Sequence, residues 1–295
     1  MIKLEYISKW GGTLNLSANE LFWLVNVDGL TAAASDISSV VIGGIDGDDI
    51  NNIQAQPRGI ILDLRVKQTA NVEQMKRAVT DVVKLKQVGT LKWTQNNRTL
   101  TIQGTVEAVT MPRFNNEVTM QISLHCSQPF WEDIHEMVSE ISNTIPLQYF
   151  TYSPDDMLYF PEEGIPFSVY DMSRTRTFNN TGDVAVGMQI EILAYKYVIN
   201  PIIYNQNGEF FGVGYGSRSV EMVAGDRIVI NTVKGQKSAK MYKNSTNEWL
   251  DMLEYIKPQS TWLQLEAGEN TFSIDSGDSY TDNMSFTLTY RQRYI

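Results

Sequence analysis

The chain of 295 residues is long enough for two domains of ordinary size, and its 42% hydrophobic and 20% charged residues are typical of a folded globular protein. A net charge of −10 without any cluster of lysine or arginine argues against a protein that grips the phosphate backbone of nucleic acid. Residues 1–135 carry 12 basic and 14 acidic side chains, whereas residues 136–295 carry 12 and 20. The second half is therefore the acidic one, which we attribute to solubility.

The single cysteine, Cys126, excludes an intramolecular disulfide. The first ten residues contain no apolar run like that of a signal peptide, and no stretch approaches the ~20 apolar residues that span a bilayer. We therefore expect no membrane insertion, and assembly in the cytosol of the cell that makes the protein.

An alternation of apolar and polar residues dominates the first half. It is clearest in residues 60–66, 100–108 and 118–126, and it predicts antiparallel strands with one buried face. The pairs Asn96-Asn97 and Asn115-Asn116 lie between such runs and suit hairpin turns, because asparagine tolerates left-handed backbone conformations.

One segment, Asn71–Lys86, has helical spacing instead. Its apolar residues form a single stripe, Asn71 suits the N-cap with Gln74 as an approximate capping-box partner, and Gly89 suits the end. Residues 1–135 thus read as a β-sheet domain with one helix.

Residues 28–56 lack a strong core pattern. They are rich in Gly, Asn, Asp and Ser around one apolar stretch, so they cannot bury much of themselves. Two interpretations stay open: the segment becomes ordered against a neighbouring subunit as an added strand or clasp, or it is a floppy surface loop. The candidate interface residues are Val40, Val41, Ile42, Asp46, Gly47, Asp48 and Asp49.

The middle of the chain changes character. Prolines interrupt residues 136–166, which we expect to be an extended connector. The alternation returns in residues 167–295 as short strands separated by turn signals, which predicts a β-sandwich.

No pattern in the chain indicates catalysis, a metal site or a cofactor. His125 and Cys126 are adjacent, but neighbours on a strand point to opposite faces, so we expect a structural cysteine. The cluster Asp46–Asp49 could bind calcium, yet it lacks the length and terminal glutamate of an EF-hand loop and suits a solvated turn better. The glycines at 212, 214 and 216 lack the strand–loop–helix context of a phosphate loop.

Several motifs, in this order, resemble the distal tail protein family of long-tailed phages. They include VIGGIDG at residues 41–47, PRGIILDLRV at 57–66, and HCSQPFW at 125–131, which is similar to the Cys-x-x-Pro-Phe-Trp signature that closes the family's first domain. A start like Asn-x-Gly-Asp at 180–183 and an Ala-Gly-Asp turn at 224–226 follow. The matching positions are Cys126, Pro129, Phe130, Trp131, Gly182, Asp183, Gly225 and Asp226.

The resemblance implies a mainly β protein with a split-barrel-like first domain (1–135), the connector (136–166) and a galectin-like β-sandwich (167–295). It also implies a structural, non-enzymatic subunit of a homohexameric ring in the virion tail, assembled in the bacterial cytoplasm. Such a ring joins the tail tube to the tail-tip or hub protein of the baseplate and is the platform for receptor-binding proteins where they are present. The alternatives are a carbohydrate- or receptor-binding baseplate module and, third, a wall-degrading glycosidase, which needs only two placed carboxylates.

Overall fold

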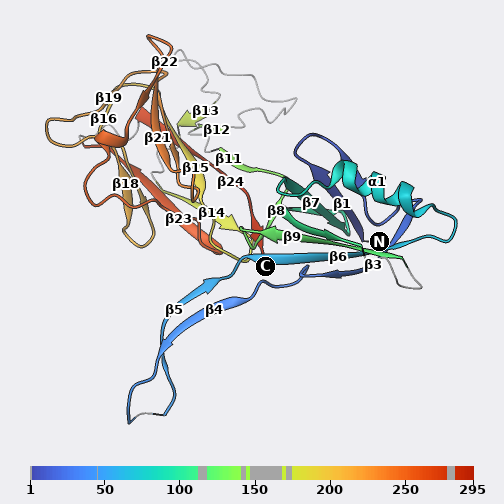
Figure 1. Ribbon diagram of the computed structural model, residues 1–295. Coiled ribbons are helices and arrows are strands. Elements are labelled where there is room, and N and C mark those ends of the chain that lie inside the picture. The colour runs from blue at the N-terminus through green and yellow to red at the C-terminus, as the bar shows by residue number, and fades with distance from the viewer. Residues whose placement is uncertain are drawn as a thin grey trace, which may run out of the picture. The chain divides into compact units, whose positions relative to one another are not determined.

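The structure, a computed structural model, describes residues 2–44, 46–111, 118–140, 144–146, 168–170, 175–277 and 283–295 (Figure 1). The chain divides into two compact units, residues 1–135 with 293–295, and residues 136–292. It therefore passes between the units twice, after His135 and after Gln292. In the described residues no helix is long and apolar enough to cross a bilayer.

The first unit is built on one antiparallel sheet. The strands of the unit are β1 (Lys3–Ser8), β2 (Thr13–Asn15), β3 (Phe22–Asp28), β4 (Ser35–Val40), β5 (Asp49–Ala55), β6 (Arg58–Val66), β7 (Val88–Gln95), β8 (Arg98–Thr110), β9 (Thr119–Cys126), β10 (Trp131–Asp133) and β25 (Arg293–Tyr294). The main path of the sheet runs β2-β1-β7-β8-β9-β6-β3, while β10 pairs with both β8 and β25. β4 and β5 form a separate two-stranded ribbon.

The alternation seen in the sequence follows the pleat of this sheet. Leu62 and Leu64 on β6 are buried together with Ile122 and Leu124 on β9, and the residues between them face the other side. Between β7 and β8, Asn96 and Asn97 both have positive φ, at 49° and 64°, as a tight hairpin turn requires. The pair Asn115-Asn116 lies outside the described residues.

The helix α1 (Val72–Val82) packs Met75 and Val79 into the apolar face of the sheet (Figure 1). Asn71 is its N-cap, but the side chain accepts from the N–H of Glu73. The helix ends four residues before the predicted Lys86, because the backbone of Lys86 joins the sheet instead: its N–H donates to the carbonyl of Val106 at 3.2 Å.

The second unit is a β-sandwich. Its elements are β11 (Met137–Glu140), β12 (Thr144–Pro146), β13 (Ser168–Tyr170), β14 (Thr175–Asn180), β15 (Met188–Ala194), β16 (Val198–Ile199), β17 (Ile202–Asn205), β18 (Phe210–Gly212), β19 (Glu221–Met222), β20 (Arg227–Asn231), β21 (Ser238–Lys243), β22 (Glu248–Asp251), the short 3-10 helix η1 (Leu253–Tyr255), β23 (Gly268–Asp275) and β24 (Met284–Tyr290). One sheet has the order β11-β24-β15-β20-β21-β22, and the other β14-β23-β17-β18.

Phe178 on β14 ties the two sheets together. Its ring centroid lies 5.8 Å from that of Phe272 in its own sheet and 5.9 Å from that of Phe286 in the opposite sheet. Aliphatic side chains of β15 and β20 complete a single buried core. The prediction of a mainly β fold is confirmed, while the split-barrel and galectin-like descriptions remain predictions.

The ends of the second unit differ from the predicted domain limits. Met137–Glu140, expected in the connector, forms β11 and pairs with β24, because it supplies an outer strand to the larger sheet. Residues 293–295, expected in the second domain, belong to the first unit. The connector residues 141–143 and 147–166 lie outside the described residues.

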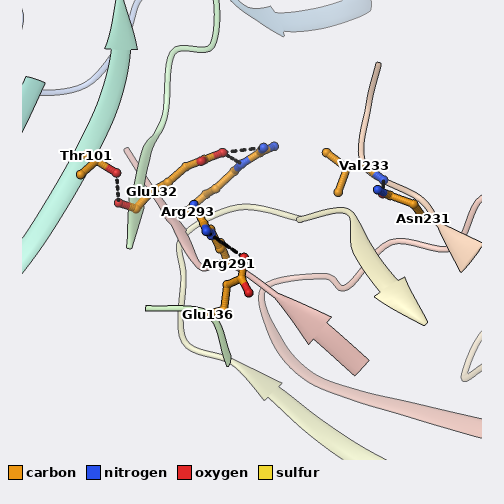
Figure 2. A network of polar contacts seen from close by, with 7 residues as sticks. All are labelled: Thr101, Glu132, Glu136, Asn231, Val233, Arg291 and Arg293. Carbon is orange, nitrogen blue, oxygen red and sulfur yellow. Dashed lines mark hydrogen bonds and ion pairs between the residues drawn. The ribbon is translucent and has the colours of Figure 1, made fainter. Parts of the chain in front are cut away.

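The last strand, β25, closes the first unit next to Trp131. Trp131 pairs with Tyr294, is fully buried, and packs edge-on against Trp93 at 5.4 Å between centroids. Glu132 accepts from Nε and Nη2 of Arg293 at 2.9 and 2.7 Å, and its carbonyl accepts from the Thr101 hydroxyl (Figure 2). These contacts hold the end of the chain in the first unit.

Replacing Trp131 by Ala should lower the free energy of unfolding by about 3–5 kcal/mol, because it leaves a large cavity in the core. The matched control is Trp23→Ala, since Trp23 lies on an edge strand of the same unit and is 59% exposed. Urea denaturation of both variants gives the comparison. Equal losses for the two would contradict the central place of Trp131.

Candidate subunit-contact site

A long arm, defined here as residues 29–57, leaves the sheet between β3 and β6 and ends in the β4–β5 ribbon (Figure 1). Each described residue from 34 to 57 is exposed. The ribbon therefore has ordered strand pairing, yet it is covered by no other described part of the chain. The two sequence interpretations, a segment ordered against a neighbouring subunit and a floppy surface loop, both remain predictions.

The base of the arm is fixed by the carbonyl of Leu30. This oxygen accepts from Nη1 of Arg58 and from Nε1 of Trp131, both at 3.1 Å. Gly29 makes the close approach possible: its φ is +82°, and a Cβ at this position would lie 2.0 Å from the carbonyl oxygen of Gly59. The arm is thus anchored to the core residue Trp131, although its outer part is free.

A β-bulge gives the ribbon two different faces. Ile37 pairs with Ile53, but Ser39 pairs with Ile50, so Asn51 is the extra residue. Ile50 and Ile53, three residues apart, would face opposite sides of a regular strand; the bulge places them on the same side. The resulting face, called the apolar face here, carries Ile37, Ile50, Ile53 and Ala55, with Ser35 and Ser39 as cross-strand partners.

The other face of the ribbon is polar. Its cross-strand pairs are Asp36 with Gln54, Ser38 with Asn52 and, at the tip, Val40 with Asp49. An amphipathic ribbon that exposes its apolar face to water is unfavourable in isolation, because each isoleucine loses roughly 1.5–3 kcal/mol of possible burial energy. The apolar face therefore indicates a contact with another surface.

The predicted interface residues all lie at the tip of the arm. Val40 ends β4, Asp49 begins β5, and Val41, Ile42, Asp46, Gly47 and Asp48 form the connection between them. Val41 is 78% exposed, and the left-handed backbone at Gly44 and Gly47 turns the chain back. The structure thus brings these residues together, as a group that projects from the unit.

Below the arm, Arg58 and Cys126 are buried cross-strand partners on β6 and β9. Burial raises the pKa of the Cys126 thiol to about 11, and the nearby guanidinium of Arg58 opposes this rise. Burial also lowers the pKa of Arg58. His125 is exposed on the other face, as the strand period predicts, so the two side chains diverge.

The other motif residues shape turns in both units. Pro129 and Phe130 lie in the turn before Trp131, and Asp183 lies in the loop after β14. The N–H of Gly182 donates to Oδ1 of Asn180 at 3.0 Å. These motif residues belong to different units, so the structure does not gather them into one site.

Asp226 is completely buried and accepts from three donors: the backbone N–H of Val223, that of Asn244, and Nζ of Lys243. Gly225 beside it has a φ of +88°, and a Cβ there would collide with Asn244. This pair therefore fixes the turns on either side of β20 and β21.

At the start of the second unit, Glu136 accepts from Nε and Nη2 of Arg291 at 3.1 and 2.7 Å (Figure 2). The same figure shows Asn231 capping the turn after β20 by accepting from the N–H of Val233. Both are structural contacts. In the described ranges no three His, Cys, Asp or Glu side chains gather as metal ligands.

Sequence reasoning found the tip of the arm but missed its apolar face and its anchor. Ile37, Ile50 and Ile53 have no regular period in the sequence, because the bulge breaks it. Nothing in the sequence indicated that Arg58 is buried, because a charged residue at the start of a strand is usually exposed to solvent. One sequence feature could have indicated a contact surface on the arm: between Gly29 and Pro57 there is no lysine or arginine, but there are four aspartates.

Comparison with known protein families gives a match for the later part of the chain. Residues 181–294 match the family described as siphovirus-type tail component, C-terminal domain. The resemblance to distal tail proteins that the sequence motifs indicate is thereby confirmed. No significant match was found among curated proteins.

The fold of the whole chain is similar to that of a solved tail protein. The crystal structure of SPP1 Dit (gp 19.1), titled a paradigm of the hub adsorption apparatus in phages infecting Gram-positive bacteria, matches with a TM-score of 0.66 and 12% identity over 99% of both chains. A chain of the phage p2 baseplate in its activated conformation with Sr has a TM-score of 0.49 and 13% identity, over 99% of this chain and 98% of that one. The first of these likenesses extends the tail-protein fold to the first unit.

The raised pKa of Cys126 predicts a pH dependence of stability. Because the folded-state pKa lies above the ordinary value of 9.0, the thiol contributes stability that is present below pH 9 and is lost as the pH rises toward 11. Against a Cys126→Val variant, the wild-type protein should lose roughly 2–3 kcal/mol of unfolding free energy over this range. Denaturant titrations from pH 8 to 11 measure it; parallel curves for both proteins would contradict the buried thiol.

Proposed function

We propose that this protein is a distal tail protein: a structural, non-catalytic subunit of a closed ring in the virion tail. The ring, a homohexamer, joins the tail tube to the tail-tip or hub protein of the baseplate and carries receptor-binding proteins where the particle has them. The observation that carries the proposal is the anchored, amphipathic arm of the first unit, in a chain whose later part matches a tail component domain.

The arm has the properties of an assembly element. Its base is held by the carbonyl of Leu30, so the ribbon leaves the unit in a defined direction. Its apolar face has no cover among the described residues, and a copy of the same chain can supply one. A contact between two different surfaces of identical subunits repeats around an axis and closes into a ring when the rotation allows.

The edges of the first unit support the same role. β2 and β3 are the two ends of the main sheet path, and each leaves one side of its backbone without a strand partner in the described residues. Exposed edges are sites for pairing with another chain. The first half is also nearly neutral, with 12 basic and 14 acidic side chains, so bringing its copies together meets little net repulsion.

The apolar face of the arm provides the direct test. Changing Ile37, Ile50 and Ile53 together to Ser should leave the stability of the monomer within about 0.5 kcal/mol, because all three are exposed. The same change should abolish the ring, since it removes apolar area from every subunit contact. Light scattering after size exclusion distinguishes one chain of 33.4 kDa from six.

The control changes the polar face of the same ribbon: Ser38→Ala, Asn52→Ser and Gln54→Ser. This variant should assemble like the wild type. A triple isoleucine variant that still forms the ring would refute the role of the arm, and a wild-type chain that stays monomeric at every concentration would refute the ring itself.

A second candidate function, carbohydrate or receptor binding by the second unit, is favoured by one cluster. On the outer face of β20–β22, the guanidinium of Arg227 lies 4.8 Å from the ring of Tyr242 and 5.5 Å from that of Trp249, and Glu191 lies 3.7 Å away. An aromatic face beside charged hydrogen-bonding groups suits the apolar and polar sides of a sugar ring.

If this cluster binds a sugar, Trp249→Ala should abolish glycan binding on an array and leave the fold intact, because Trp249 is 50% exposed. Thermal unfolding of the variant checks the fold. A wild-type protein that binds no glycan, or a variant that binds equally well, would eliminate this candidate without touching the ring proposal.

A further inference from the structure

The arm needs a receiving surface, and the first unit carries one with matching properties. This helix-end patch is defined by Lys9, Trp10, Lys84, Leu85, Lys86 and Val88. Resting on the ring assembly proposed above, we infer that the arm of one subunit docks on the helix-end patch of the next copy of the chain.

The two segments of the patch lie close together. Ser8 on β1 pairs with Gly89 on β7, so the turn that follows Ser8 lies beside Val88. The same turn meets the end of α1, since a Cβ on Gly12 would touch the side chain of Val82 at 3.6 Å. Residues 9–12 and 84–88 thus share one corner of the unit.

The patch is held rigidly. The N–H of Lys86 donates to the carbonyl of Val106, and the N–H of Val106 donates to that of Gln87 at 3.0 Å. On the other side of the corner, the N–H of Ser8 donates to the carbonyl of Gly12 at 2.8 Å. A preordered surface binds a partner at a lower entropic cost than a mobile one does.

The patch exposes large apolar side chains. Trp10 is 76% exposed and Leu85 is 59% exposed, and Val88 adds a third apolar residue to the same surface. No described part of the chain covers them. They can pack against the apolar face of the arm, which is made of Ile37, Ile50, Ile53 and Ala55.

The arm and the helix-end patch carry opposite charges. The arm carries four aspartates, at positions 36, 46, 48 and 49, and no lysine or arginine. The two segments of the patch carry Lys9, Lys84 and Lys86 and no acidic residue. Opposite charges around an apolar contact guide the encounter and fix the register of the two surfaces.

The arm is long enough for this contact. At about 3.3 Å per residue, a limb from Gly29 to Ile42 spans at most roughly 45 Å. A domain of the size of the first unit is about 35–40 Å across. The tip can therefore reach well onto a neighbouring copy.

Crosslinking tests the contact directly in the full chain. With Cys126 changed to Val, the substitutions Val41→Cys and Leu85→Cys in the same chain should give disulfide-linked oligomers under oxidation, seen as a ladder on a non-reducing gel. Lys234→Cys in place of Leu85→Cys is the control, because Lys234 is exposed in the second unit and should not link. Crosslinking of the control as efficiently as the pair would overturn the inference.

Charge exchange tests the selectivity. Lys84→Glu with Lys86→Glu should raise the protein concentration needed for half assembly by about tenfold. Adding Asp46→Lys and Asp48→Lys should restore assembly. Lys234→Glu with Lys240→Glu makes the same change in net charge in the second unit and should have little effect.

The outcomes separate the two proposals. If the wild-type chain forms rings that require the arm isoleucines, but the 41–85 disulfide does not form and the lysine reversal acts no differently from its control, the docking surface is wrong and the ring proposal stands. If no ring forms, both fail.

Discussion

The carbonyl of Leu30 is the contact on which the rest of the functional structure depends. It accepts from both Arg58 and Trp131, so the base of the arm is hydrogen-bonded to a fully buried tryptophan of the first unit. Trp131 in turn pairs with Tyr294 near the end of the chain. A stable core, the return of the last residues and the base of the arm thus meet at one residue, Trp131.

This coupling bears on the proposed role of the exposed ribbon in assembly. An amphipathic ribbon on a flexible joint would lose much conformational entropy on docking, whereas one anchored at its base has already lost part of it. The bulge at Asn51 then determines which side is apolar. In the proposed docking, burial of the isoleucines would supply the energy, and the aspartates of the arm would favour a basic partner surface.

In the second unit, the motif residues have a structural role in turns. Residues such as Asn180 and Asp226 satisfy backbone donors and acceptors in turns and do not form an exposed site. Turn residues of this kind fix where each short strand begins, because their side chains satisfy backbone groups in the turns. The exposed Trp249 lies beside one of these turns, because its cross-strand partner Tyr242 directly precedes Lys243, which contacts Asp226.

The sequence by itself determined the strand faces of residues 60–66 and 118–126 and the helix stripe around Met75, because these depend on local periodicity. Its motifs also carried the resemblance to distal tail proteins. It also marked residues 28–56 as unable to form a core. Only the tertiary structure decided that this segment is a paired ribbon, that Ile50 and Ile53 share a face, and that Arg293 and Tyr294 return to the first unit. A bulge breaks the period, and pairing between residues 131 and 294 leaves no local pattern, so neither was readable from the sequence.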